Sequence, residues 1–249
     1  MHGFRTTSTE VLEAIVGSSR LVKLPPHRSV YREGDEATIA YIVERGLVNR
    51  VADRKDRRIQ LPRAYPGDWL GLAEVIEGSQ GDSVYSHSAI TTRDPVRLLA
   101  IRKEDISRLM RMPEFGTLIA LQISKEIRTA HDVLSDLSYG HLHYKVVSYL
   151  ARQMAKLQDA YPGQEPSWME THLEIAKSIG AGRESVTRAL LKLKKEGVLG
   201  SPPSHPSVIV ITNPEKLLEL QRKNGLHSGT PHVKPKPADS PSEVESSIA

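Results

Sequence analysis

The sequence predicts an α+β fold, in which an N-terminal antiparallel β-roll of jelly-roll type is followed by a long helix and a C-terminal winged helix-turn-helix. Three observations predict it. Short runs rich in β-branched residues, separated by turn residues, fill residues 20–101. A helical pattern of apolar residues then spans residues 112–137. Further along, two short amphipathic segments meet at Gly180-Ala181-Gly182.

The N-terminal domain is expected over residues 10–111, after a flexible segment of residues 1–9. A short helix over residues 10–16 leads into it. Strands are predicted over residues 20–24, 29–31, 40–44, 47–51, 57–61, 85–92 and 96–101. Many short strands at this spacing are typical of a small antiparallel barrel or sandwich, which a helix over residues 103–110 would close.

Residues 112–137 have the pattern of a coiled-coil helix. Small or apolar residues recur at alternating spacings of four and three, at Gly116, Ala120, Ile123, Ile127, Ala130, Leu134 and Leu137. A seam of this kind holds for about three heptads. Other apolar residues, including Leu118, Leu121 and Val133, lie off the seam and are expected to pack on the β-roll. A helix with two apolar faces fits one face against its own roll and the other against a partner.

Residues 170–199 predict the helix-turn-helix. Thr171 is expected to be the N-cap of the first helix, with Glu174 completing a capping box. Glycine supplies the backbone freedom for the bend. The second helix has a buried side of Val186, Ala189, Leu190 and Leu193, and an opposite side of Arg183, Glu184, Thr187, Arg188, Lys192 and Lys195. This layout is typical of DNA-binding motifs whose second helix enters the major groove by its N-terminus.

The segments around this motif complete a predicted domain over residues 138–226. A hinge over residues 138–144 precedes a helix over residues 145–158. Two strands, at residues 198–199 and 208–212, flank a Pro-rich turn and predict a wing. A short helix follows over residues 214–221, and the Pro- and Ser-rich residues 227–249 are expected to be disordered.

Composition limits the classes of function. The chain has 249 residues, a net charge of +4 and no cysteine. Disulfides, thiolate zinc sites and cysteine-ligated iron–sulfur clusters are therefore excluded. Without a signal peptide or a run of membrane-spanning length, the chain is expected to be soluble and cytoplasmic, with no membrane partner. It carries no recognisable catalytic motif, so neither an enzyme nor a metal or other cofactor is expected.

The stretch from Thr171 to Leu199 resembles the signature of the Crp/Fnr family of bacterial transcription regulators. Arg183, Glu184, Val186 and Arg188 match the Arg-Glu-x-Val-x-Arg pattern that begins the family's recognition helix. The N-terminal half is similar to the family's cyclic-nucleotide-binding roll, on the landmarks Gly34-Asp35, Tyr41-Ile42-Val43, Gly46 and Pro66-Gly67-Asp68-Trp69-Leu70-Gly71. The resemblance covers roughly residues 21–218 and implies a homodimer that binds double-stranded DNA and RNA polymerase.

The resemblance also implies roles for individual residues. Arg183, Glu184 and Arg188 would read base edges, since Arg donates twice to guanine and Glu accepts from cytosine. Contacts to DNA phosphates are expected from Thr171, Ser185, Thr187 and Lys192. The dimer seam would consist of Ala120, Ile123, Ile127, Ala130, Leu134 and Leu137. Two recognition helices about 34 Å apart would read a two-fold symmetric site.

The effector pocket departs from the family's pattern. The cyclic AMP cassette runs Gly-Glu-Leu and later Arg-Ser, whereas this chain has Gly71-Leu72-Ala73 and Asp82-Ser83. Leu72 therefore replaces the ribose acceptor and Asp82 replaces the phosphate-binding Arg, while Glu74 could serve only after a register slip. On the long helix, Ala130-His131 aligns with the Thr-Ser pair that reads adenine. We expect a degenerate pocket, formed by Gly71, Leu72, Asp82, Ser83 and His131, that does not bind cyclic AMP.

Two alternatives remain open on the sequence alone. The roll could bind a different small molecule that controls DNA affinity, and nothing in the sequence decides this. The chain could also bind DNA without base specificity. The set Arg183, Glu184 and Arg188 disfavours that second alternative, because it suits base reading better than an evenly basic surface does.

Overall fold

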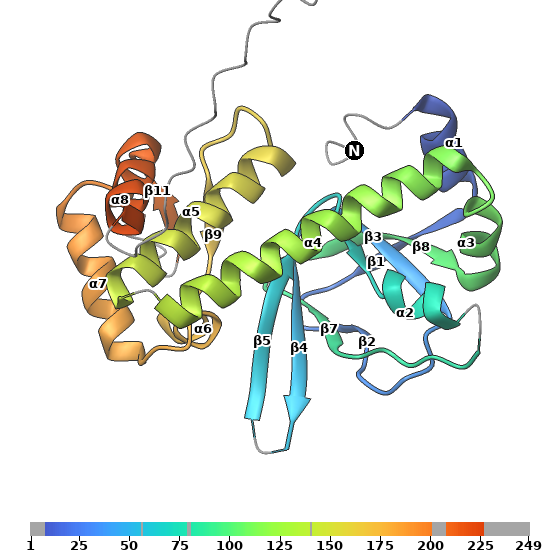
Figure 1. Cartoon of the computed structure of the whole chain (residues 1–249), viewed down its shortest axis with the longest axis horizontal. Helices are drawn as coiled ribbons and strands as arrows, with labels where there is room; N and C mark the ends of the chain where they lie inside the picture. The colour runs from blue at the N-terminus through green and yellow to red at the C-terminus, as the bar shows by residue number, and fades with distance from the viewer. Residues whose placement is uncertain (1–7, 56, 79–80, 140, 201–207, 227–249) are drawn as a thin grey trace, which may run out of the picture.

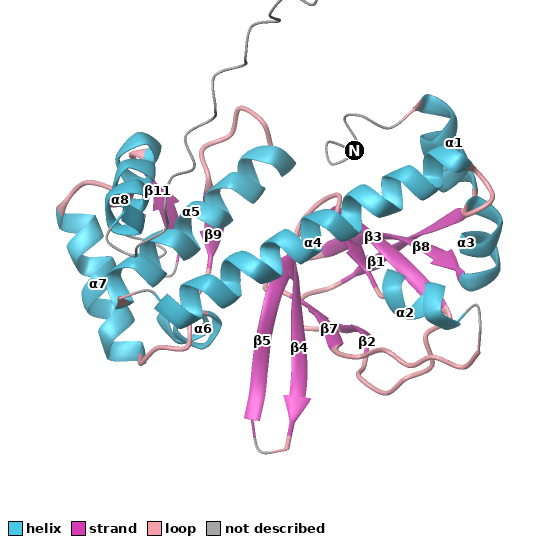
Figure 2. Ribbon diagram, in the orientation of Figure 1, coloured by secondary structure: helices cyan, strands magenta, loops and turns pink. Residues whose placement is uncertain are grey.

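The computed structural model describes residues 8–55, 57–78, 81–139, 141–200 and 208–226. It confirms the α+β class, with antiparallel sheets at the N-terminal end, a long helix, and a helical C-terminal region with a small sheet (Figures 1 and 2). Within these ranges, every helix is too short or too polar to cross a membrane.

The roll consists of two four-stranded antiparallel sheets. The first has the order β1 (Ser19–Leu24), β8 (Val96–Arg102), β3 (Ile39–Arg45) and β6 (Trp69–Leu70). The second has the order β2 (Ser29–Tyr31), β7 (Ser88–Thr91), β4 (Val48–Arg54) and β5 (Arg57–Ala64). The β4–β5 hairpin extends beyond the rest of the roll, below α4 in Figure 1. Burial alternates along β7 and places Ala89 and Thr91 inside.

Three short helices pack around the sheets, namely α1 (Thr9–Gly17), α2 (Leu72–Glu77) and α3 (Lys103–Leu109). The core of the roll includes Val11 and Ile15 of α1, together with Ile106 of α3. The same core includes Phe115 and Ile119, which belong to the next helix along the chain. The roll is thus closed by helices at both ends of its sequence.

The long helix α4 (Pro113–Tyr139) runs from the roll to the C-terminal region (Figure 1). Its first turns are anchored in the roll, where the Phe115 ring meets the Trp69 ring edge-on at 6.2 Å between centroids. Leu118 also packs against the core of the roll, as predicted. Leu121 does not, because it is 56% exposed. The expectation that Leu121 packs on the roll is therefore wrong.

The C-terminal region contains α5 (Leu142–Ala160), β9 (Ser167–Met169), α6 (His172–Ser178), α7 (Arg183–Lys195), β10 (Leu199–Gly200), β11 (Val208–Ile211) and α8 (Pro214–Leu226). Its sheet has the order β10-β11-β9. A second hydrophobic core fills the space between these elements, and it includes Tyr65 from the roll. The two halves of the chain therefore share side chains at their junction.

The structure adds three elements that the sequence pattern did not predict: β6, α2 and β9. All three are shorter than the periodicity of a helix or strand needs to become visible, and β9 converts the predicted two-stranded wing into a three-stranded sheet. Helix α5 begins at Leu142, inside the predicted hinge. Ser8 is the N-cap of α1 and Thr9 begins it, so the flexible segment predicted over residues 1–9 is wrong at its last two residues. Residues 1–7, the turn of the wing over residues 201–207 and the tail over residues 227–249 lie outside the described residues.

Candidate DNA-reading surface and effector pocket

The helix-turn-helix is fixed by a cap, a glycine and a buried seam. Thr171 caps α6 through both halves of a capping box, because its hydroxyl accepts from the Glu174 amide and the Glu174 carboxylate accepts from the Thr171 amide. This confirms the predicted cap. Gly180 has a φ of +63°, and a Cβ there would lie 3.3 Å from Leu137 Cδ2. The turn therefore lies close to the end of α4.

Helix α7 buries one side and exposes the other, as its sequence predicts. The buried side consists of Val186, Ala189, Leu190 and Leu193. Arg183, Glu184 and Arg188 are exposed at the start of the helix. Within the described part of the chain, no ion pair ties any of these three to another residue, and Arg188 reaches only the Ser185 hydroxyl at 3.4 Å. Their charged groups are therefore available to a ligand.

The predicted phosphate contacts are partly engaged within the protein. The Thr171 hydroxyl takes part in the capping box, and the Thr187 hydroxyl donates to the Arg183 carbonyl. Thr187 Oγ1 also lies 2.8 Å from His172 Nδ1, which links α7 to α6. Burial and the nearby Lys194 and Arg183 lower the pKa of His172, which favours its neutral form. Lys192 lies on the exposed side of α7, 3.9 Å from Glu196.

The predicted effector residues do not converge on one place. Gly71 has a φ of +68°, and a Cβ there would come within 2.5 Å of the Tyr85 ring, so this position requires glycine. Leu72 is buried among the apolar residues of the roll core. Asp82 and His131 are both exposed, on the loop after α2 and on α4, and Ser83 is half-buried.

A chain of hydrogen bonds inside the roll was missed by the sequence analysis. Glu74 of α2 is buried, and its Oε1 accepts from the Ser86 hydroxyl at 2.6 Å and from the Ser86 amide at 3.3 Å. Ser86 Oγ lies 3.1 Å from His87 Nδ1, and His87 Nε2 lies 3.1 Å from the Tyr31 hydroxyl. Tyr31 in turn stacks on Tyr85 at 3.8 Å between ring centroids. Glu74 is thus the carboxylate of α2 that faces inward, and its Oε1 already accepts from Ser86.

Burial and the nearby charges favour the neutral forms of His87 and Tyr31 in this chain. Burial and Arg50 lower the pKa of His87, while Glu74 and Glu33 act in the opposite direction. Burial, reinforced by Glu74, raises the pKa of Tyr31 well above its usual range. Arg50 Nη1 lies 3.5 Å from Glu126 Oε1, which connects β4 to the middle of α4. The interior of the roll is therefore a set of mutually paired polar groups.

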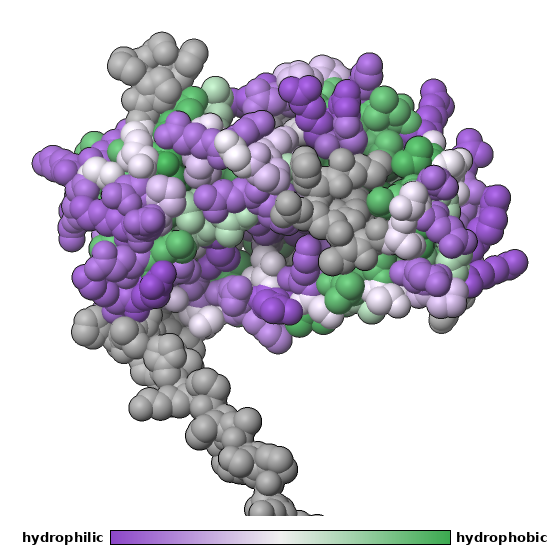
Figure 3. Space-filling view, turned by 90° about the horizontal axis from the view of Figure 1, so that it is seen from above, coloured by the Kyte–Doolittle hydropathy of each residue, from purple (hydrophilic) through white to green (hydrophobic). Residues whose placement is uncertain are grey.

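The residues of the predicted dimer seam all lie exposed on α4. The largest exposed fraction among them is that of Leu134, at 60%, and Ile123, Ile127 and Leu137 are also exposed large apolar side chains. Figure 3 views the molecule from above relative to Figure 1 and shows separate apolar areas among hydrophilic ones. An exposed row of apolar residues at heptad spacing on one helix is unusual for a surface that faces only water.

A buried ion pair joins the roll to the C-terminal region. Arg63 of β5 donates to Glu170 Oε1 at 3.1 Å, and the two side chains are 6% and 1% exposed. The Tyr149 hydroxyl donates to the same oxygen at 2.7 Å, and Trp168 Nε1 donates to Glu170 Oε2 at 2.9 Å. Glu170 immediately precedes the cap of α6. The start of the helix-turn-helix is therefore held against the roll.

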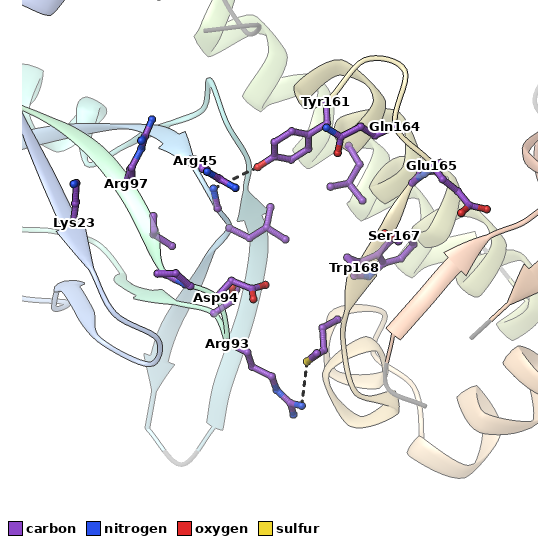
Figure 4. Close-up of a pocket in the computed structure, with 18 residues that line it drawn as sticks. Lys23, Arg45, Arg93, Asp94, Arg97, Tyr161, Gln164, Glu165, Ser167 and Trp168 are labelled. Atoms are coloured by element: carbon purple, nitrogen blue, oxygen red, sulfur yellow. Dashed lines mark hydrogen bonds between the residues drawn. The ribbon is translucent and has the colours of Figure 1, made fainter. Parts of the chain in front are cut away.

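The opposite side of this junction is an open cleft of about 630 Å³ (Figure 4). Two long contacts cross it: the Gly46 amide donates to the Tyr161 hydroxyl at 3.4 Å, and Arg93 Nη1 lies 3.6 Å from Met169 Sδ. Arg97, which lines the roll side, is engaged by Glu44 in two hydrogen bonds. The described residues contain no group of three or more His, Cys, Asp or Glu side chains that could hold a metal ion.

Comparison with known proteins agrees with both halves of the fold. Residues 21–112 match the cyclic nucleotide-binding domain, and residues 145–220 match the Crp-like helix-turn-helix domain. The chain is 29% identical over 175 residues to the transcriptional regulator LdrP of Thermus thermophilus, covering 70% of this chain and 84% of that protein. It is 25% identical over 182 residues to the cyclic AMP receptor protein of the same species, covering 72% and 79%.

Among solved structures, the c-di-GMP responsive global regulator CLP of Xanthomonas campestris matches with a TM-score of 0.65 at 22% identity. The match covers 83% of this chain and all of that one. At 22% sequence identity, this match shows a similar fold and nothing about the ligand.

Proposed function

Because the chain belongs to the Crp/Fnr family of DNA-binding transcription regulators, which are not enzymes, we propose that it reads a two-fold symmetric DNA site as a homodimer and does so without cyclic AMP. The proposal has three parts, which rest on different regions of the molecule. These are the exposed face of α7, the exposed row of α4 and the interior of the roll.

The proposal rests mainly on the exposure of Arg183, Glu184 and Arg188 and on their lack of ion-pair partners among the described residues. They are exposed together on the first two turns of α7, and no ion pair ties them to other described residues. Arg188 lies four residues after Glu184 and so falls on the same side of the helix. An arginine fork that is free to donate twice suits guanine, and a free carboxylate suits the amino group of cytosine. We therefore assign base reading to these three residues.

Dimerisation is supported by the exposed row on α4. Ile123, Ile127 and Leu134 lie exposed at spacings of four and seven residues, while the turns before them are anchored in the roll by Phe115 and Ile119. A second copy of the same helix would cover these residues and would pair two α7 helices for a two-fold site. A regulator of this kind would act in the cytoplasm, where it would also meet RNA polymerase.

Independence from cyclic AMP is supported by the roll interior. The only α2 carboxylate that faces inward, among the described residues, is that of Glu74, and Ser86 already donates to it twice. Asp82 would add a negative charge where the family's cassette has an Arg, and Leu72 presents no acceptor to a ribose hydroxyl. A cyclic nucleotide would therefore meet a carboxylate whose Oε1 is already engaged by Ser86 and would gain no cation in the cassette.

One selection experiment tests the proposal. Purified protein is mixed with a pool of random duplex DNA, with and without added cyclic AMP, and the bound fraction is sequenced over several rounds. We expect one palindromic sequence to be enriched equally in both arms. Enrichment only with cyclic AMP would overturn the ligand part, and an asymmetric or unenriched pool would overturn the rest.

A second candidate is a sensor whose DNA affinity is controlled by a different small molecule. It is favoured by the cleft of about 630 Å³ between the two halves, since ligand sites of such size are common at domain junctions. The name of the CLP regulator also states a response to c-di-GMP, a ligand other than cyclic AMP. Enrichment of the palindrome only after adding small molecules extracted from cells would favour this candidate.

A further inference from the structure

A small cavity of about 50 Å³ lies where the roll, the long helix and the C-terminal region meet. It is separate from the open cleft of Figure 4, with which it shares no lining residue. Its wall includes Arg63 and Tyr65 from the roll, Thr129 from α4, Gln153 and Lys156 from α5, and Glu170. Every major part of the chain thus contributes a polar side chain to it.

Three residues of this wall each have a buried polar atom without a hydrogen-bond partner. The atoms are Arg63 Nη1, Tyr65 Oη and Gln153 Oε1. Five such side-chain atoms occur in the described part of the chain, and the other two, on Trp69 and Thr92, belong to residues outside this wall. Leaving a buried polar group unpaired costs about 1–3 kcal/mol, so a group of three around one cavity calls for a common partner.

The charge of the wall indicates what that partner is. Arg63 is paired with Glu170, and Arg152, which also lines the cavity, is engaged by Asp136. Lys156 Nζ lies 4.0 Å from Asp68 Oδ2 and 5.2 Å from the centroid of the Tyr65 ring, over the face of that ring. Burial lowers the pKa of Lys156 more than Asp68 raises it, so its positive charge is only partly compensated.

Donors without partners also outnumber acceptors. Arg63 Nη1 and the Tyr65 hydroxyl can both donate, and Lys156 has donor capacity beyond its one long contact. Gln153 contributes the unpaired acceptor, but rotating its amide would present the NH₂ group instead. With the amide rotated, all four of these residues line the cavity with a donor group, which suits a negatively charged occupant.

We propose that this cavity binds a small inorganic anion, such as chloride or nitrate, through Arg63 Nη1, the Tyr65 hydroxyl and the Lys156 ammonium group. One water needs about 10–15 Å³ of such space, so the cavity has room for a small ion together with a few waters, whereas sites for nucleotide-sized ligands measure about 300–1,000 Å³. Bound there, the anion bridges β5 to α5 beside the Arg63–Glu170 pair. It therefore stabilises this arrangement of the DNA-binding region against the roll, whether or not the protein binds cyclic AMP.

The test compares anions at constant ionic strength. Full-length protein is dialysed into a buffer that contains gluconate, an anion too large for the cavity. Chloride, bromide or nitrate then replaces gluconate, and the midpoint of thermal unfolding is recorded at each concentration. We expect a saturable rise of the midpoint. Tyr65→Phe removes one donor to the anion. It should raise the half-saturating anion concentration about tenfold, which is the effect of one charge-assisted hydrogen bond.

Tyr161→Phe is the matched control, because it removes a tyrosine hydroxyl at the open side of the same junction. Its anion response should equal that of the natural protein. Gln153→Glu provides a second test, since it places a carboxylate in the cavity and should abolish the response while raising the midpoint in gluconate alone. The same non-saturable slope in all four proteins would mean an adventitious ion only and would overturn the proposal.

Crystals soaked in bromide give a direct readout. For the natural protein we expect an anomalous peak within hydrogen-bond distance of Arg63 Nη1 and Tyr65 Oη. We expect no such peak in crystals of the Gln153→Glu variant. Ordinary water density there, without an anomalous signal, would show that water satisfies these atoms and would contradict the proposal.

Discussion

The outer face of α7 and the interior of the roll both carry polar groups where a ligand is expected, but these groups differ in their partners. On α7, Arg183, Glu184 and Arg188 are exposed and outside the ion pairs of the described chain. In the roll, Glu74 and His87 are buried and bound to one another through Ser86. The first set can form new hydrogen bonds without breaking old ones, whereas Glu74 Oε1 and both ring nitrogens of His87 are already engaged. This contrast is the reason that we propose base reading for α7 and no binding of cyclic AMP for the roll.

The two regions are connected by the Arg63–Glu170 pair and by α4.

Ile127→Glu should have the largest effect, because it would bury like charges across the two-fold axis of the proposed dimer. We expect monomers at micromolar concentration in sedimentation experiments and loss of high-affinity DNA binding. Without a second α7, the free groups of that helix would read only half of the site. Leu121→Glu is the control, since it adds the same charge to an equally exposed residue of α4 that lies off the seam. If both variants stay dimeric, the seam assignment is wrong.

Glu170→Ala removes the carboxylate that joins the roll to the start of α6. Arg63 would remain buried without its counter-charge, so the free energy of unfolding should fall by about 3–5 kcal/mol in urea titrations. The double variant Arg63→Met with Glu170→Leu should recover most of this loss, because no buried charge remains unpaired. Arg108→Ala breaks the exposed pair with Asp105 and should cost at most about 1 kcal/mol. An equally mild effect of Glu170→Ala would mean that the junction does not rest on this pair.

Much of this architecture follows from local sequence patterns. The capping box of Thr171 and Glu174 and the apolar side of α7 are set by residues within one or two helical turns, and both were predicted correctly. The chain Glu74–Ser86–His87–Tyr31 was not predicted, because its ends lie 43 residues apart and polar residues in a short helix and strand give no periodic signal. Arg63 and Glu170 are 107 residues apart, and only the packing of two domains brings them together.

Arg188→Ala tests the free face of α7. If Arg188 donates twice to guanine, its loss should weaken binding to the selected palindrome by about 1–3 kcal/mol while scrambled DNA of equal length is affected far less. Competition gel shifts at fixed salt measure both values. Lys192→Ala is the comparison variant and should weaken both DNAs alike and reduce the salt dependence. Equal losses on specific and scrambled DNA for Arg188→Ala would show that it contacts phosphate only.

His87→Gln tests the occupied interior of the roll. Burial and Arg50 keep the pKa of His87 below its ordinary value, so the folded protein binds fewer protons than the unfolded chain. The stability that neutral His87 contributes is therefore present above about pH 6.5 and is lost as the pH falls below this value. One pH unit lower, the free energy of unfolding should have fallen by at most about 1.4 kcal/mol through this group. The His87→Gln variant should lose this part of the pH dependence between pH 7.5 and 5.5 in urea titrations. His131→Gln changes an exposed histidine of α4 outside this hydrogen-bond chain and is the matched control.

Adding cyclic AMP should have the smallest effect, and we expect none. For a nucleotide to bind as the family's cassette implies, its ribose would need an acceptor, yet Glu74 is already bound by Ser86 and Leu72 has no polar atom. Its phosphate would face Asp82 instead of an arginine, and repulsion between like charges opposes binding wherever water is excluded. Calorimetry should therefore give no heat of binding at physiological concentrations, and gel shifts should be the same with and without the nucleotide. A micromolar dissociation constant would contradict this reading of the pocket.

The double variant Leu72→Glu/Asp82→Arg provides a second test, because it introduces the two side chains that the family's cassette has at these positions. If binding appears only in that variant, the two substitutions are what separates this roll from a nucleotide site. If it stays absent while circular dichroism shows that the variant is folded, groups other than Leu72 and Asp82 keep the nucleotide out.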